Sequence, residues 1–121
     1  MGYKYRLVKE DEWRFELLPN NSSIQPVGRS GMYKTKQEAM EGMKRLKIFL
    51  LKTNFEEISY EIAELPLSRS RQYQGFFQFS EMGEMFYTTR YEQLSEVEKG
   101  IKRISKNYNA EYRNELNEVK F

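Results

Sequence analysis

The amino-acid sequence predicts an α+β fold of two tandem β-β-β-α(-β) repeats, which share one antiparallel sheet with two helices on one face. Residues 33–46 recur in register at residues 91–104, with Tyr, Glu, Gly, Lys and Arg identical at matching positions. Segments of alternating polar and apolar residues precede both copies, as expected of half-buried strands. The chain is therefore interpreted as a single domain, 1–121, with repeat one at about 3–54 and repeat two at about 55–121.

Both copies of the repeated segment predict an amphipathic helix. Their apolar residues step by four, three and four along the chain, which places them on one helical face. Thr35 with Glu38, and Ser95 with Glu98, fit a capping box that begins each helix. A glycine sits in the middle of each copy, where it costs about 1 kcal/mol relative to alanine. We therefore expect a close approach between helix and sheet at both glycines.

The strands are expected where polar and apolar residues alternate between turn residues. Six such segments are expected as strands, at 3–8, 13–18, 22–28, 59–64, 73–80 and 85–89. Residues 109–121, which follow the second helical segment, fit either a final strand or a tail.

Composition removes several kinds of chemistry. The chain has no cysteine and no histidine, which excludes disulfides, thiolate nucleophiles and imidazole metal ligands. It contains neither a P-loop nor a dinucleotide-binding glycine motif. Its many glutamates form chance pairs that are expected to lie on a solvated surface. We therefore expect no catalytic residues, no metal site and no cofactor.

Charge and hydropathy bound the location and the partners. Twenty Lys and Arg are nearly balanced by eighteen acids, so the net charge of +2 gives a weak field for a phosphate-binding protein. No segment is apolar enough to span a bilayer, and the N-terminus lacks the pattern of a signal peptide. A cytoplasmic location, no membrane partner, and a monomer or homodimer are expected.

The order of strands followed by Tyr-x-Thr-Lys-x-x-Ala-x-x-Gly-Met-x-x-Leu resembles the YegP-like family of small bacterial proteins. The residues that carry this resemblance are Tyr33, Thr35, Lys36, Ala39, Gly42, Met43 and Leu46, with Tyr91, Gly100, Ile101 and Ile104 in the second copy. The resemblance implies one sheet in which the strand after each helix exchanges into the other repeat, here at 56–64 and about 112–119. The family has no established activity, so the resemblance implies a fold and leaves the function open.

The first fifty residues also resemble the arm-type DNA-binding domain of tyrosine recombinases. In that domain a three-stranded sheet enters the major groove. The resemblance implies that Lys4, Arg6, Arg14 and Glu16 face the groove. The matching face of repeat two carries glutamine and phenylalanine and no basic residue.

Aromatic and basic residues supply the candidate binding positions. Aromatic residues make up 15% of the chain, and those near Phe76 occupy both faces of one expected strand. Phe76 is therefore expected either to be exposed or to pack under residues 66–72. The repeated Lys-Arg pairs fit either a partner contact or a solvated helix face. The candidate binding residues are Phe76, Arg14, Lys44, Arg45, Arg69, Arg71, Lys102 and Arg103.

These observations favour a small non-catalytic binding protein. A protein partner is favoured over nucleic acid because the net charge is small and the expected sheet is rich in aromatic residues. An adaptor or inhibitor carried by a phage or mobile element fits this description. A nucleic-acid-binding protein that uses the sheet face and the Lys-Arg pairs is the alternative, and an enzyme is the least favoured hypothesis.

Overall fold

The computed structural model describes residues 2–21, 25–66 and 71–113, which form an α+β fold with one mixed seven-stranded sheet. The strand order is β4-β5-β6-β3-β2-β1-β7. The elements are β1 (Tyr3–Lys9), β2 (Trp13–Pro19), β3 (Gly28–Ser30), α1 (Lys36–Lys52), the short 3₁₀ helix η1 (Phe55–Glu57), β4 (Glu61–Pro66), β5 (Arg71–Gln78), β6 (Met85–Thr88), α2 (Leu94–Lys106) and β7 (Glu111–Tyr112).

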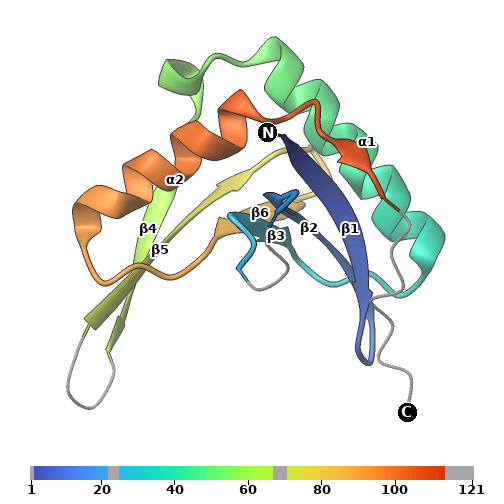
Figure 1. Cartoon of the computed structure of the whole chain (residues 1–121), viewed down its shortest axis with the longest axis horizontal. Helices are drawn as coiled ribbons and strands as arrows, with labels where there is room; N and C mark the ends of the chain where they lie inside the picture. The colour runs from blue at the N-terminus through green and yellow to red at the C-terminus, as the bar shows by residue number, and fades with distance from the viewer. Residues whose placement is uncertain (1, 22–24, 67–70, 114–121) are drawn as a thin grey trace.

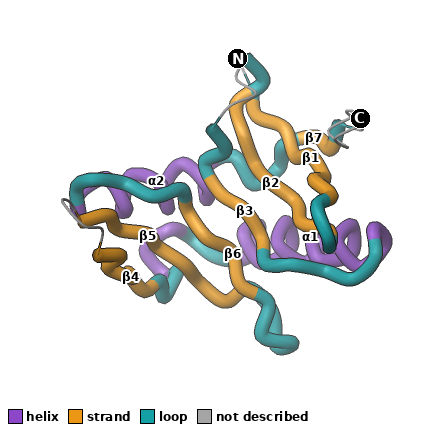
Figure 2. The backbone as a smooth tube through the Cα atoms, turned by 90° about the horizontal axis from the view of Figure 1, so that it is seen from below, coloured by secondary structure: helices purple, strands orange, loops and turns teal. Residues whose placement is uncertain are grey.

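Both helices lie on one face of the sheet, as predicted. Figure 1 shows an arched sheet whose β1–β2 and β4–β5 strands descend at its two ends, with α1 and α2 on the outer side. Seen from below in Figure 2, the strands lie in front of both helices, so no helix of the described residues covers the opposite face. Neither helix in the described part of the chain is long and apolar enough to cross a bilayer.

The core lies between the helices and the sheet. The buried residues of α1 include Met43 and Leu46, and those of α2 include Ile101 and Ile104, so the predicted helical faces are confirmed. Phe15 is fully buried beneath them, where its ring stacks 5.7 Å from that of Phe86. Strands from both halves of the chain therefore share one core.

The two halves meet where β3 pairs antiparallel with β6. Arg29 lies opposite Tyr87, and these two residues are as far apart along the chain as Tyr33 and Tyr91. An antiparallel pair has a local twofold axis, and within this ladder the axis relates Gly28, Arg29 and Ser30 to Phe86, Tyr87 and Thr88, their counterparts in the sequence repeat. Val27 thus occupies the place that Met85 occupies on the other side of the axis.

Of the two predicted capping boxes, the one at Thr35 and Glu38 is half formed and the one at Ser95 and Glu98 is wrong. Thr35 caps α1, because its Oγ1 accepts a hydrogen bond from the Glu38 N–H at 3.1 Å. The cap of α2 is Gln93 without a side-chain hydrogen bond, and Ser95 lies inside the first turn. A backbone bridge between Tyr91 and Tyr73 of β5 holds the chain just before this helix. The helix therefore begins directly after Gln93, although the capping motif in the sequence starts two residues later, at Ser95.

The third strand was predicted too early. It spans Gly28–Ser30 rather than 22–28, of which 22–24 lie outside the described residues. Pro26 has no N–H to donate to a neighbouring strand, and a proline is disfavoured in a strand that is paired on both sides. Pairing with both β2 and β6 is therefore possible only beyond this proline.

The predicted antiparallel sheet is correct from β4 to β1 and wrong at one edge, where β7 runs parallel to β1. A tight turn joins β1 to β2 and forces those strands to be antiparallel. No hairpin joins β7 to β1, because α2 first carries the chain past the sheet, so the direction of β7 is not constrained in this way. β7 pairs with β1 at its edge of the sheet. The strand expected at 56–64 begins only at Glu61, because Phe55–Glu57 form η1, and it pairs with β5. Residues 114–119 of the strand expected at about 112–119 lie outside the described residues.

The mid-helix glycines make room for tyrosines rather than for the sheet itself. A Cβ atom on Gly100 would lie 2.7 Å from the hydroxyl oxygen of Tyr91, and one on Gly42 would collide with the hydroxyl of Tyr33. Each tyrosine precedes its helix and folds back onto it. The prediction of a close approach is correct, but the approaching group is a side chain.

Replacing Gly42 with alanine should therefore destabilise the protein by about 1–3 kcal/mol, the usual range for overpacking. This loss opposes the gain of about 1 kcal/mol that alanine brings to a free helix. Guanidinium unfolding measures the change. Gly31→Ala is the matched control, because a Cβ there meets no atom within 4 Å. An unfolding free energy for Gly42→Ala at or above that of the wild type would contradict the tyrosine packing.

Candidate functional site

The candidate residues from the sequence fall in separate regions of the molecule. Arg14 and Phe76 lie on the helix-free face of the sheet, while Lys44 is exposed on α1. Arg71 is exposed at the start of β5, where it pairs with Glu64 at 2.9 Å. Arg69 lies outside the described residues.

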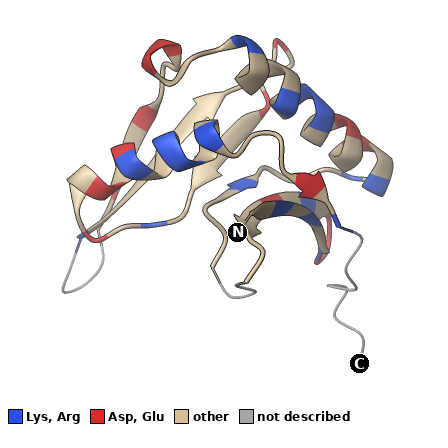
Figure 3. Cartoon of the chain, turned by 45° about the horizontal axis from the view of Figure 1, so that its top comes forward, with Lys and Arg blue, Asp and Glu red and all other residues tan. Residues whose placement is uncertain are grey.

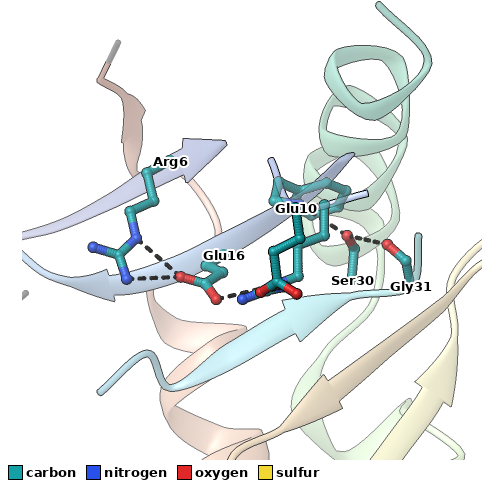
Figure 4. A network of polar contacts seen from close by, with 7 residues as sticks. Arg6, Glu10, Glu16, Ser30 and Gly31 are labelled. Carbon is teal, nitrogen blue, oxygen red and sulfur yellow. Dashed lines mark hydrogen bonds and ion pairs between the residues drawn. The ribbon is translucent and has the colours of Figure 1, made fainter. Parts of the chain in front are cut away.

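An ion-pair network covers one end of the helix-free face. The Glu16 carboxylate accepts hydrogen bonds from Arg6 Nε at 2.9 Å and from Arg14 Nε at 3.1 Å (Figure 4). Arg14 also donates to Glu10 at 2.8 Å. The Glu16 side chain is only 5% exposed. Because carboxylates of the same chain hold these guanidinium groups, Arg6 and Arg14 are poorly placed to read a DNA groove.

A small aromatic cluster lies beside this network on the same face. Phe76 is half-buried, and its ring centroid is 5.9 Å from that of Tyr87. The Arg29 guanidinium lies 5.4 Å from the centroid of the Tyr87 ring. These three side chains could contact a planar partner group by stacking.

Arg45 belongs to a structural cluster around Glu84. Its Nε donates to Glu84 Oε1 at 2.6 Å, and the Tyr33 hydroxyl donates to Oε2 at 2.6 Å. Ser80 Oγ adds a third donor at 2.7 Å. The Glu84 side chain is 9% exposed, so the cluster joins α1 to the β5–β6 turn from within.

The protonation of Glu84 follows from these contacts. Burial alone raises the pKa of the carboxyl group. The hydrogen bonds from Arg45, Tyr33 and Ser80, with the charge of Arg45, outweigh burial and hold the pKa below its usual value. Glu84 is therefore held as the ion, and Arg45 commits two of its guanidinium nitrogens to it.

Lys102 and Arg103 lie at a hollow of about 630 Å³ beside the C-terminal half of α2. We call this site the α2 hollow and define it by four basic and two aromatic residues. These are Lys99, Lys102, Arg103, Lys106, Tyr3 and Phe55. The basic residues are spaced so that they form one stripe along the helix, and Figure 3 shows Lys and Arg at this end of α2.

The positive charge of the α2 hollow is weakly compensated. Lys99 and Lys102 meet exposed glutamates of their own helix at 3.5 and 3.9 Å, which are weak contacts. Lys102 Nζ also lies 5.2 Å from the Phe55 ring centroid. Arg103 makes no ion pair within the described residues, and Glu56 is the acid that lines the hollow. The hollow can therefore attract an anionic group and hold an apolar one beside it.

Sequence reasoning found part of this site. It named Lys102 and Arg103 from the repeated Lys-Arg pair. It missed Lys99 and Lys106, although their helical spacing from that pair was a usable signal. Nothing in the sequence indicated that an N-terminal tyrosine and a phenylalanine from η1 would complete the hollow.

Comparisons with known proteins support the fold and no function. No protein-family model and no curated protein matches the chain. The solution structure of YegP from E. coli, a protein of unknown function, has a TM-score of 0.69 at 18% identity, covering 100% of this chain and 97% of that one. A UPF0339 protein from Shewanella oneidensis has a TM-score of 0.65 at 17% identity, with 99% and 95% covered. The resemblance to YegP-like proteins is thereby confirmed at the level of the fold.

Proposed function

We propose that this chain is a non-catalytic protein-interaction module, which binds an acidic segment of a partner protein in the α2 hollow. The observation that carries the proposal is the stripe of four basic side chains on α2 beside Tyr3 and Phe55. Basic side chains steer an acidic partner and fix its position. Aromatic groups supply the apolar contact area from which such interfaces gain most of their affinity.

The shape and charge of the hollow favour a protein segment over a nucleic acid. From Lys99 to Lys106 the stripe extends only about 10 Å at the rise of an α-helix. Nucleic-acid binders commonly contact many phosphates along a longer basic surface. Nucleic-acid binding remains the second candidate function, because Arg29, Tyr87 and Phe76 offer a stacking surface on the helix-free face.

Fluorescence anisotropy tests the proposal with four labelled probes. A glutamate-rich peptide with a central phenylalanine serves as the acidic peptide, and the same peptide with glutamines serves as its neutral control. Single-stranded and double-stranded DNA are the other two probes. We expect the acidic peptide to bind more tightly than the other three, with an affinity that falls between about 50 and 200 mM salt. Tighter binding of DNA would favour the second candidate, and equal binding of both peptides would contradict the proposal.

Two variants locate the interface. Lys102→Gln should weaken binding of the acidic peptide, because it removes a charge from the hollow. Phe76→Ala should leave that binding unchanged and cost about 1 kcal/mol of stability, since it removes one half-buried aromatic contact. The reverse pattern in anisotropy and guanidinium unfolding would place the interface on the helix-free face.

A further inference from the structure

Tyr33 and Tyr91 occupy matching places in the two halves of the chain. Tyr33 exchanges two backbone hydrogen bonds with Trp13 at 2.6 and 2.7 Å, and Tyr91 exchanges two with Tyr73 at 2.7 and 2.8 Å. Each tyrosine then packs on the glycine of the helix that follows it. An arginine stands three residues beyond each glycine, one helical turn further along the same side of the helix.

The first of these tyrosine–arginine pairs holds a carboxylate. Arg45 donates to both oxygens of Glu84, at 2.6 and 3.0 Å, and Tyr33 donates to Oε2 at 2.6 Å. Two donors from a guanidinium group and one from a hydroxyl group form a site that fits a planar carboxylate. In repeat one, the tyrosine–arginine site is therefore filled by a carboxylate of the same chain.

The second pair has the same parts and lacks the carboxylate. The residue that matches Glu84 is Pro26, because Val27 and Met85 are related by the β3–β6 axis. The hydroxyl oxygen of Tyr91 is buried and has no hydrogen-bond partner among the described residues. Arg103 is exposed and makes no ion pair within the described part of the chain. A buried hydroxyl group without a partner costs free energy, which an incoming acceptor would recover.

Arg103 and Tyr91 belong to the same side of α2, because the Tyr91 hydroxyl packs at Gly100 and Arg103 follows one helical turn later. Burial raises the pKa of Tyr91, the positive charge of Arg103 opposes that rise, and Glu96 and Tyr3 add to it. Arg103 also lines the α2 hollow, so a ligand in the hollow can reach its guanidinium group. The Arg103 side chain is exposed and open to an incoming carboxylate, and the buried hydroxyl of Tyr91 packs one helical turn before it.

We propose that Arg103 and Tyr91 bind a glutamate or aspartate side chain of the partner, in the arrangement that Arg45 and Tyr33 make with Glu84. This inference rests on the proposed function and deepens it, because it assigns one carboxylate of the acidic segment to one place in the hollow. The other basic residues of the stripe then attract the acidic segment through their charge, while Arg103 orients one of its carboxylates through directed hydrogen bonds.

The first test compares arginine with a neighbouring lysine. Arg103→Gln should weaken acidic-peptide binding about tenfold or more, as expected for hydrogen bonds to a charged group. Lys99→Gln removes the same charge from the same stripe and should weaken binding about threefold or less. Tyr91→Phe should also weaken binding, at unchanged net charge. Equal losses for Arg103→Gln and Lys99→Gln, with none for Tyr91→Phe, would overturn the assignment.

The second test supplies the carboxylate from within the chain and needs no peptide. Pro26→Glu places a glutamate where the axis puts the counterpart of Glu84, and Pro26→Gln is its neutral control. We expect Pro26→Glu to melt at a higher temperature than Pro26→Gln, and we expect adding Arg103→Gln to abolish that difference. Equal melting temperatures of Pro26→Glu and Pro26→Gln would show that Arg103 and Tyr91 do not accept a carboxylate.

The two tests separate this inference from the proposed function. If the wild type binds no acidic peptide but Pro26→Glu is stabilised through Arg103, the carboxylate site stands and the proposed partner is wrong. If the peptide binds but Arg103 behaves like Lys99 and Pro26→Glu is not stabilised, the function stands and the site is wrong. DNA binding that is tighter than peptide binding and is lost in Arg103→Gln would assign this position to phosphate and overturn the inference.

Discussion

Replacing Ile101 with aspartate should unfold the protein. Ile101 is 0% exposed and lies on the face of α2 that packs against the sheet. A carboxylate there would lose its hydration without gaining a partner, which costs several kcal/mol. That loss is comparable to the whole stability of a small domain, about 5–15 kcal/mol. Circular dichroism and guanidinium unfolding at neutral pH measure the outcome.

Two controls make the Ile101 result specific. Ile101→Val keeps the apolar surface and should cost about 1 kcal/mol. Leu94→Asp places the same charge on α2 at a side chain that is 53% exposed, and it should change stability by about 0.5 kcal/mol or less. A cooperative native transition of Ile101→Asp at the wild-type midpoint would show that this face of α2 is not part of the core.

Replacing Glu84 with alanine should destabilise the protein by about 3 kcal/mol, because it leaves the partly buried Arg45 and the partly buried Tyr33 hydroxyl without their acceptor. The partial exposure of Arg45 keeps the loss near the lower end of the range for broken buried pairs. Guanidinium unfolding measures it. Glu81→Ala is the control, since Glu81 is an exposed acid in the same turn. Equal unfolding free energies for the two variants would mean that the cluster contributes nothing to stability.

The lowered pKa of Glu84 predicts a pH dependence with a definite sign. Its folded-state pKa lies below the ordinary value of 4.5, so the unfolded chain takes up the proton more readily. The cluster therefore contributes its full stability above the unfolded pKa, and this contribution is lost as the pH falls through the folded pKa. Glu84→Gln should remove this part of the pH dependence below about pH 5. An unchanged slope in acid unfolding curves would contradict the lowered pKa.

The sequence alone determined the local elements and their faces. Apolar steps of four and three specified which sides of residues 36–52 and 94–106 would be buried, because a helix repeats every 3.6 residues. The alternation of polar and apolar residues located most strands, because successive side chains of a strand point to opposite faces. The internal repeat also indicated that Tyr33 and Tyr91, with Arg45 and Arg103, hold equivalent positions.

Only the tertiary structure showed that the two equivalent tyrosine–arginine pairs have different surroundings. Glu84 and Arg45 are 39 residues apart and meet only because β6 pairs with β3, which brings the β5–β6 turn to α1. Pro26 is the residue that the register of this pairing relates to Glu84. The α2 hollow likewise combines β1, η1 and α2, three elements that are far apart in sequence. The periodicity of a sequence shows which residues share one face of a helix or strand. A site depends on how separate elements pack against one another, and the sequence pattern does not specify that packing.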